Sequence, residues 1–148
     1  MTDPRLAIKP PEWLKGMNEQ FMQDGNVPLD VLLVPGRKSG VLRSTPLTVA
    51  DLDGRRYILG GFPAADWIKN VRAAAGRGTL TIHDHDAEEV RLVEVDEAEA
   101  LSVLRAWPQV TPDGVEMMRD AGVIADVTPD ALAVAVGICP VFRVERAA

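Results

Sequence analysis

The pattern of apolar and polar residues along the chain predicts a series of short strands. Strand-like runs are rich in branched apolar residues and are bounded by glycine, proline or aspartate. Six segments fit this description: 30–34, 42–50, 55–59, 79–83, 88–95 and 141–145. The dipeptide Asp53-Gly54, which separates two of them, is a strong signal for a two-residue hairpin turn. Strands joined by such short turns pair antiparallel, so we expect a mostly antiparallel sheet.

Apolar residues at helical spacing predict helices around these strands. The first runs from Glu12 to Gln23 and carries an apolar stripe (Trp13, Leu14, Met17 and Phe21). We expect this stripe to pack on the core of the domain; a membrane surface and a bound cofactor are the alternative partners. Further helical segments are expected at 65–75, 96–105, 113–121 and 128–136.

The helix at 96–105 has signals at both ends. Asp96 is its expected N-cap, with Glu99 three residues further on. Trp107-Pro108 is expected to break it, because proline removes a backbone donor and collides with the preceding turn.

Together these elements predict an α+β chain, in which a small antiparallel barrel is flanked by helices. A length of 148 residues fits one domain. A domain of that size buries enough surface to be stable without disulfides. We expect residues 1–10 to form a loose arm on this domain.

Composition narrows the class of protein. The single cysteine, Cys139, rules out an internal disulfide and is consistent with a reducing cytoplasm; we expect a buried, inert thiol. The N-terminus lacks the pattern of a signal peptide, and the longest apolar run, 131–140, is shorter than the roughly 20 residues that span a bilayer. We therefore expect a cytoplasmic protein without a transmembrane segment, and peripheral membrane contact stays open.

Charge is distributed unevenly along the chain. The net charge is −6, which argues against a nucleic-acid-binding protein. Between Asp30 and Leu80, however, eight lysines and arginines stand against four acids. An acidic protein that collects positive charge in one third of its length is expected to attract a small anion there.

The loop Gly36-Arg37-Lys38-Ser39-Gly40, with Arg43 three residues beyond, is the sharpest chemical feature. Its glycines let the backbone turn N–H groups to one side, and Ser39 adds a hydroxyl. The forked guanidinium groups of Arg37 and Arg43 suit phosphate or carboxylate oxygens, and Lys38 adds a point charge. We expect an anion site; the alternative is a solvated basic hairpin loop. The order of residues is not that of a P-loop.

A second feature lies between Gly60 and Asn70. Gly60-Gly61 would permit a flat ligand to approach the backbone closely. Trp67 and Asn70 are three residues apart on a predicted helix and so share a face. An aromatic ring and an amide on one helix face suit a ligand that has a flat ring and a polar tail. In the alternative interpretation, Trp67 packs in the core and Asn70 is exposed.

The ordered set of these residues resembles a known family. The basic loop, then Arg43, Pro46-Leu47, a hairpin and Trp67-x-x-Asn70 are similar to the deazaflavin (F420)-dependent nitroreductases, a flavin/deazaflavin oxidoreductase family. The resemblance covers about Asp30 to Ile82 and implies a split β-barrel related to the FMN-binding oxidases. It implies the cofactor F420, an 8-hydroxy-5-deazaflavin with a phosphate and an oligoglutamate tail, and FMN is the runner-up.

The resemblance also implies roles for individual residues. Those that match the family's phosphate and tail site are Arg37, Lys38, Ser39, Gly40, Arg43 and Asn70. Those that match the groove for the tricyclic ring are Pro46, Leu47, Gly60, Gly61 and Trp67. The implied reaction is hydride transfer from the reduced cofactor to an electron-poor small molecule: a quinone, a nitro compound or an activated enone. A homodimer is a further implication.

The chain departs from the family pattern at two points. Nitroreductase members often carry a Ser-Lys pair after the third strand, where this chain has Gly60-Gly61-Phe62-Pro63. They also carry tyrosines in the C-terminal third, whereas the one tyrosine here, Tyr57, lies elsewhere. Nitroimidazole reduction is therefore not expected, and no substrate is named.

Other interpretations stay open. A non-catalytic carrier of the same cofactor would use the same residues, and the fold could also hold FMN or haem. No side chain is identified as catalytic, because the cofactor itself performs hydride chemistry. His83 and His85 are of the residue type that binds metals, but two ligands at a hairpin tip favour a plain turn, so no metal is expected.

Overall fold

The computed structural model describes residues 3–24, 30–82 and 85–147. Within them, seven strands form one sheet in which every neighbouring pair is antiparallel. The strands are β1 (Asp30–Pro35), β2 (Leu42–Leu47), β3 (Ala50–Leu52), β4 (Arg55–Leu59), β5 (Arg77–Thr81), β6 (Ala87–Glu94) and β7 (Val141–Arg146). Their order across the sheet is β2-β1-β5-β6-β7-β4-β3.

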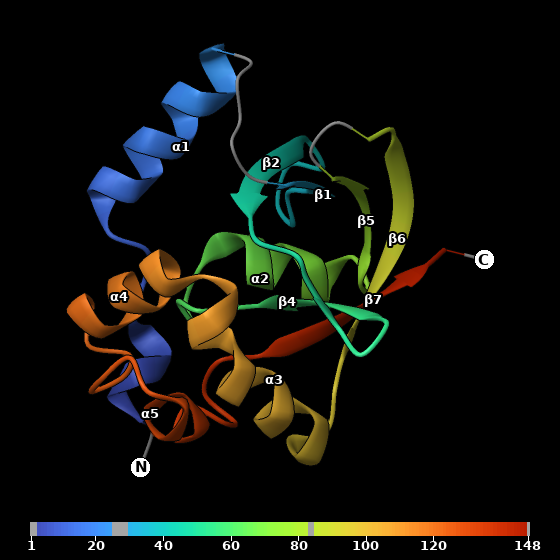
Figure 1. Cartoon of the computed structure of the whole chain (residues 1–148). Helices are drawn as coiled ribbons and strands as arrows, with labels where there is room; N and C mark the ends of the chain where they lie inside the picture. Colours follow the sequence, from blue (N-terminus) through green and yellow to red (C-terminus); the bar gives the residue numbers. More distant parts are fainter. Residues whose placement is uncertain (1–2, 25–29, 83–84, 148) are drawn as a thin grey trace.

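The sheet curls into a half-barrel with helices packed around it (Figure 1). The α-helices in the described residues are α1 (Glu12–Asp24), α2 (Asp66–Ala73), α3 (Glu97–Val110), α4 (Pro112–Asp120) and α5 (Pro129–Ala133). The expected class, an α+β split β-barrel of mostly antiparallel strands with flanking helices, is confirmed.

Two hairpins close the opposite edges of the sheet. The β3–β4 turn places Asp53 at φ 54° and Gly54 at φ 79°, the left-handed pair that a two-residue hairpin requires. The hairpin expected at Asp53-Gly54 is therefore confirmed. At the other edge, β1 and β2 are joined by the basic loop, with Val34 opposite Arg43.

The strand expected at 42–50 is wrong as a single element. The segment splits into β2, which pairs with β1, and β3, which pairs with β4 at the far edge. Between them the chain leaves the ladder, and the backbone N–H of Val49 donates to a carboxylate oxygen of Asp30 at 3.3 Å. Periodicity could not reveal this crossing, because both halves read as strand.

Two hydrophobic clusters fill the interior, and β4 lies between them. Successive side chains of a strand point to opposite faces, so Ile58 packs with α2 whereas Tyr57 and Leu59 pack with the C-terminal helices. The first cluster joins α2 to the strands through Leu32, Ile68, Val71, Leu80 and Phe142. The second joins the sheet to α3, α4 and α5 through Leu104, Trp107, Val115, Leu132 and Cys139.

Helix α3 continues through the expected break at Pro108 and ends at Val110. Trp107 is buried in the second cluster, and this packing holds the last turn in place despite the missing backbone donor. Cys139 is buried as expected, and burial raises the pKa of its thiol to about 12, so the reactive thiolate does not form near neutral pH.

The N-terminal arm has more order than the sequence indicated. Residues Pro4–Ala7 form a short 3-10 helix, and Arg5 binds Asp3 and the carbonyl of Val134. The carbonyl of Ile8 accepts a hydrogen bond from the backbone N–H of Ala64 at 2.9 Å. These contacts connect the arm to two distant parts of the body.

Helix α1 stands at the side of the body rather than on its core (Figure 1). None of its residues joins either hydrophobic cluster, so the expected packing of its stripe on the core is wrong. Helix α1 contacts β2 at the edge of the sheet, whereas α2 contacts β1 and supplies Ile68 and Val71 to the first cluster. Trp13, Met17 and Met22 stay exposed. Among the helices described, no segment has the length and apolar character needed to cross a membrane.

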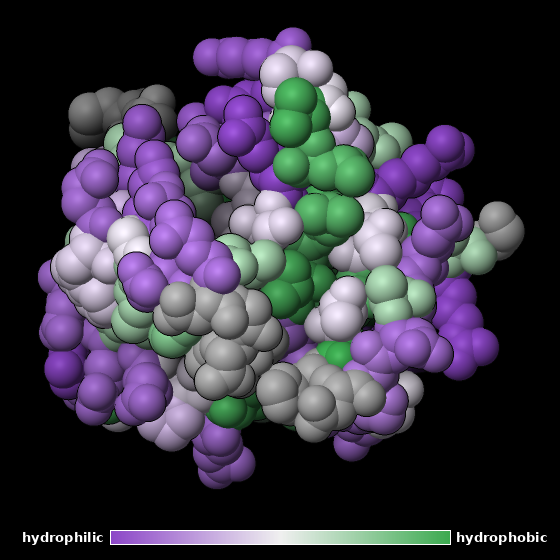
Figure 2. Space-filling view, turned by 90° about the horizontal axis from the view of Figure 1, so that it is seen from above, coloured by the Kyte–Doolittle hydropathy of each residue, from purple (hydrophilic) through white to green (hydrophobic). Residues whose placement is uncertain are grey.

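Exposed apolar residues also follow the basic loop. Val41 and Leu42 are 57% and 58% exposed. Figure 2 looks down on the end of the molecule that carries α1 and the β1–β2 hairpin, and shows hydrophobic residues gathered into a band between hydrophilic ones. This face therefore offers both apolar surface and charge.

The Phe142→Ala substitution is expected to lower the free energy of unfolding by about 3–5 kcal/mol, the usual effect of removing a buried ring. Phe142 is 1% exposed, and its ring centroid lies 5.9 Å from that of Trp67. Urea denaturation measures the change. Val134→Ala, at a 65% exposed position, is the control and should stay within about 0.5 kcal/mol of the wild type. Equal stability of the two variants would contradict the assigned core.

Candidate functional site

The basic loop is a closed turn rather than an open strand connection. The backbone N–H of Gly36 donates to the carbonyl of Val41, and that of Gly40 donates to the carbonyl of Gly36, each at 2.8 Å. Gly40 has φ 75°, which glycine adopts without strain. The Oγ of Ser39 accepts from the backbone N–H of Val41 at 3.2 Å. The amide of Gly40 is thus used inside the turn.

Asn70 fastens this loop to α2. Its Oδ1 accepts from the backbone N–H of Arg37 at 3.0 Å and from Nη1 of the same residue at 2.9 Å. Asn70 is 6% exposed and is the one buried polar side chain in the part of the chain that the structure describes. The alternative in which Asn70 is exposed is therefore wrong.

An acid also reaches the loop, although none is near it in the sequence. Nη2 of Arg37 lies 3.3 Å from Oδ1 of Asp66. Asp66 is one helical turn before Asn70, so both side chains lie on the same face of α2. Sequence analysis missed this carboxylate, and the i, i+4 spacing of Asp66 and Asn70 was the signal that could have found it.

Lys38 and Arg43 differ from Arg37. Neither has a hydrogen bond or ion pair with any residue that the structure describes, and both are exposed. Nε of Arg43 lies 3.5 Å from the position that a Cβ on Gly36 would take, so this side chain runs back along the loop. The hairpin therefore carries two cations that are available to an anion.

The residues expected to form the ring groove are packed by the chain itself. A Cβ on Gly60 would lie 2.7 Å from Cδ1 of Ile68, and one on Gly61 would lie 3.1 Å from Sδ of Met118. Packing of neighbouring side chains thus explains both glycines, and their contact with a ligand stays a prediction.

The remaining predicted groove residues have one side toward the core. Trp67 is half-buried and meets Phe142 at an interplanar angle of 54°. Pro46 is buried, and Leu47 packs against the first hydrophobic cluster. The structure thus brings Arg37 and Asn70 together, whereas it divides the ring residues between core and surface.

Two hollows lie away from these residues. One, of about 280 Å³, is lined by Arg5, Ile124 and Val134 among others. The other, of about 240 Å³, lies beside Arg72, Glu97 and Cys139. Neither is lined by a residue expected to bind the cofactor.

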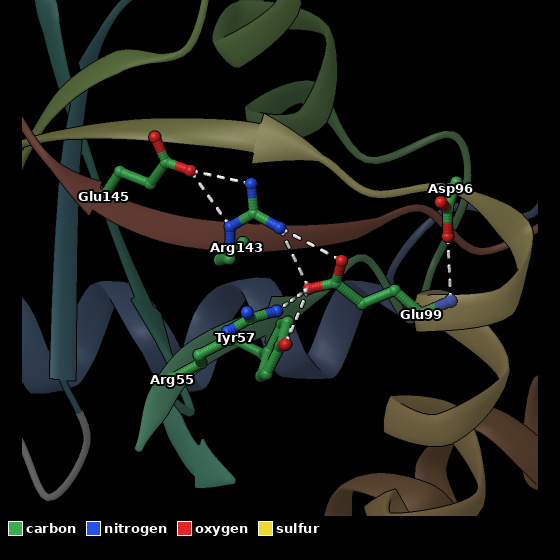
Figure 3. Close-up of polar contacts among 6 residues, drawn as sticks. All are labelled: Arg55, Tyr57, Asp96, Glu99, Arg143 and Glu145. Carbon is green, nitrogen blue, oxygen red and sulfur yellow. Dashed lines mark hydrogen bonds and ion pairs between the residues drawn. The ribbon is translucent and has the colours of Figure 1, made fainter. Parts of the chain in front are cut away.

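A polar network joins α3 to the sheet (Figure 3). Glu99 accepts from the phenol of Tyr57 at 2.7 Å and from Nη1 of Arg143 at 3.0 Å, and Arg55 lies 3.6 Å away. The hydrogen bond from Tyr57, together with Arg143, lowers the pKa of the Glu99 carboxyl. Burial, with the bond to Glu99 second, raises the pKa of Tyr57. Because these groups partner one another, the network fastens α3 to β4 and β7.

The expected N-cap of α3 is confirmed. The side chain of Asp96 accepts from the backbone N–H of Glu99 at 2.9 Å (Figure 3). The Glu99 side chain faces the sheet instead of returning to the cap, because Tyr57 and Arg143 supply its donors.

Metal ligands do not gather in the described ranges. No group of three or more histidine, cysteine, aspartate or glutamate side chains there could hold an ion. His83, one of the two histidines considered in the sequence, lies outside those ranges, so the interpretation of this pair as a plain turn stays a prediction.

No model of a known protein family matches the chain. Among solved structures, one described as a domain-swapped dimer is 21% identical with a TM-score of 0.56, over 90% of this chain and 98% of that one. Campylobacter jejuni ChuZ is 8% identical with a TM-score of 0.51, over 89% of this chain and 53% of its own. An F420-H2-dependent reductase, FDR-A, is 22% identical with a TM-score of 0.49, over 80% and 94%. At these identities the first two establish a shared fold.

The Glu99→Gln substitution should reduce the pH dependence of stability. Since the folded pKa of Glu99 is lowered, its stabilisation is fully present above the unfolded value of about 4.3. It is lost as the pH falls through the lower folded value. The free energy of unfolding of the wild type should exceed that of the variant by about 1–2 kcal/mol at pH 7, and this difference should narrow toward pH 3. Urea denaturation at several pH values measures this.

The matched control is Glu97→Gln on the first turn of the same helix, where the side chain is exposed. The free energy of unfolding of Glu97→Gln should differ little from that of the wild type, and the difference should be nearly constant with pH. A Glu99→Gln gap that stayed unchanged down to pH 3 would show that the network does not stabilise the ionised carboxylate.

Proposed function

We propose that the protein is an oxidoreductase that binds reduced F420 and passes hydride to an electron-poor small molecule. The observation that carries this proposal is a pair of cations, Lys38 on the loop and Arg43 just after it, that have no partners among the described residues, while Asn70 fastens the loop to α2. A quinone, an activated enone or a nitro compound is the acceptor class that the family resemblance implies.

The chemistry of the loop fits a phosphate. Lys38 offers a compact ammonium and Arg43 a planar fork, and both suit phosphate oxygens. The backbone N–H groups of Lys38 and Ser39 have no acceptor among the residues described, so they are also available. A glycine-bounded turn with free N–H groups is a common anion cradle. In the proposal these groups hold the phosphate and the acidic tail of the cofactor.

An apolar surface adjoins this cradle. Val41 and Leu42 are exposed immediately after the loop, and they support the placement of a flat tricyclic ring on this side of the hairpin. The exposed part of Trp67 is the proposed far boundary of the ring site, with Leu47, Gly60 and Gly61 beneath it. When bound, the reduced deazaflavin supplies the hydride. The chain binds and orients the ring, and we assign no catalytic side chain.

We also propose that residues 1–148 act as one cofactor-binding domain that pairs with a second copy. The neighbour described as a domain-swapped dimer supports pairing in this fold. Sedimentation equilibrium should give twice the mass of 16.0 kDa. A monomer at micromolar concentration would count against the dimer without affecting the redox proposal.

The experiment that tests the redox function has two stages. Fluorescence titration of F420, FMN and haem against the protein should rank F420 first. Reduced F420 with a panel of quinones, enones and nitroaromatics should then lose its absorbance with time. Saturable binding without turnover on any acceptor would favour a carrier. Tighter binding of FMN or haem would make that molecule, instead of F420, the cofactor of the protein.

Lys38→Ala and Arg43→Ala should each weaken F420 binding by about 1–3 kcal/mol, the range for a charge-assisted hydrogen bond. The weakening should shrink at high salt, because exposed charges are screened. Arg91→Ala, an exposed arginine of β6, is the control and should leave the dissociation constant unchanged. If both loop variants bind like the wild type, these residues do not form the site.

A further inference from the structure

The three cations of the basic loop are not equivalent. Arg37 is engaged by Asn70 and Asp66, whereas Lys38 and Arg43 have no such partners among the described residues. We propose that Arg37 and Asn70 are positioning residues that fix the loop, and that of the three cationic side chains only those of Lys38 and Arg43 contact the bound anion. This inference rests on the proposed function, because it assigns roles within the same site.

The amide of Asn70 has little left to offer an anion. An amide oxygen has two lone pairs, and both donors of Arg37 converge on Oδ1. A phosphate oxygen is an acceptor and cannot bind this atom. Only the Nδ2 group could reach a ligand, and the side chain is 6% exposed.

Asp66 offsets part of the positive charge of Arg37. Its carboxylate lies 3.3 Å from Nη2, and it is 77% exposed at the rim of the loop. An arriving phosphate would meet this acid as well as the guanidinium. Lys38 and Arg43 therefore attract the anion. Arg37 binds Asn70 and Asp66 on one face of α2.

The value of this arrangement is rigidity. Ile68 and Val71 bury α2 in the first hydrophobic cluster, at 0% and 1% exposure. A loop bonded to such a helix is held before any ligand arrives, so binding loses less conformational entropy. The backbone bond from Arg37 to Asn70 sets the direction in which the next residue, Lys38, leaves the loop.

The first test needs no ligand. Hydrogen exchange should show the backbone amide of Arg37 protected in the wild type, and at least tenfold less protected in Asn70→Ala. Arg72→Ala, on the same helix and paired with Glu94, is the matched control and should keep this protection. Equal exchange in wild type and Asn70→Ala would overturn the positioning role. The result stands whether or not the protein binds F420.

The second test compares substitutions by F420 titration over a range of salt. Asn70→Ala should weaken binding roughly tenfold without changing the slope of log Kd against log salt, whereas Lys38→Ala should flatten that slope. Asn70→Asp keeps an acceptor for Arg37 but adds a negative charge, so its affinity should approach that of the wild type as salt screens that charge. Wild-type affinity in Asn70→Ala would show that the bonds of Asn70 to the loop do not assist binding, and would overturn the inference.

Arg37→Lys provides a variant on an exposed loop in case the change at Asn70 prevents folding. Lysine keeps the charge but cannot reproduce the fork that spans Asn70 and Asp66. It should therefore weaken binding as much as Asn70→Ala does. Wild-type affinity in Arg37→Lys would show that charge alone matters at this position. Absence of F420 binding by the wild type would reject the proposed function, and the exchange experiment would still decide the role of Asn70.

Discussion

The seating of α2 in the curl of the sheet is the constraint on which the candidate site depends. Burial of Ile68 and Val71 fixes how the helix is rotated, and this rotation turns Asp66 and Asn70 toward the β1–β2 hairpin. The loop's internal hydrogen bonds close its turn, but they do not set the direction in which the turn points from the body. Its bonds to a buried helix give it a fixed direction.

This support explains how an acidic chain can maintain a local cationic site. The net charge is −6, yet Lys38 lies on the turn and Arg43 at the start of the strand that follows it. Among the described residues, the one acid bonded to the loop is Asp66, and it pairs with Arg37. The acid therefore orients the loop more than it neutralises the two exposed cations. Val41 and Leu42 add exposed apolar surface directly after the loop, so the hairpin presents apolar and cationic side chains together.

The C-terminal half is fastened to the sheet by a separate set of contacts. Glu99 receives bonds from β4 and β7, and α3 through α5 bury Leu104 and Leu132 against the same strands. β4 is buried on both faces, so its backbone separates the two clusters, and few side chains belong to both. The network of Figure 3 is accordingly a support of the fold. The loop of the proposed anion site is bonded instead to α2, which packs in the other cluster.

Local signals in the sequence determined the features that depend on neighbouring residues. The Asp53-Gly54 turn, the Asp96 cap and the glycine-bounded loop follow from backbone preferences within a few positions, and the run of short strands determined the fold class. Only the tertiary structure decided that the segment 42–50 divides between two edges of the sheet and that α3 continues through Pro108. It also decided that α2, and not α1, packs in the core. It alone showed Asn70 buried under Arg37 and Asp66 beside it. These outcomes depend on packing and hydrogen bonds between segments that are distant in the sequence, 33 residues apart in the case of Arg37 and Asn70. Periodicity along the chain carries no record of which distant segments meet.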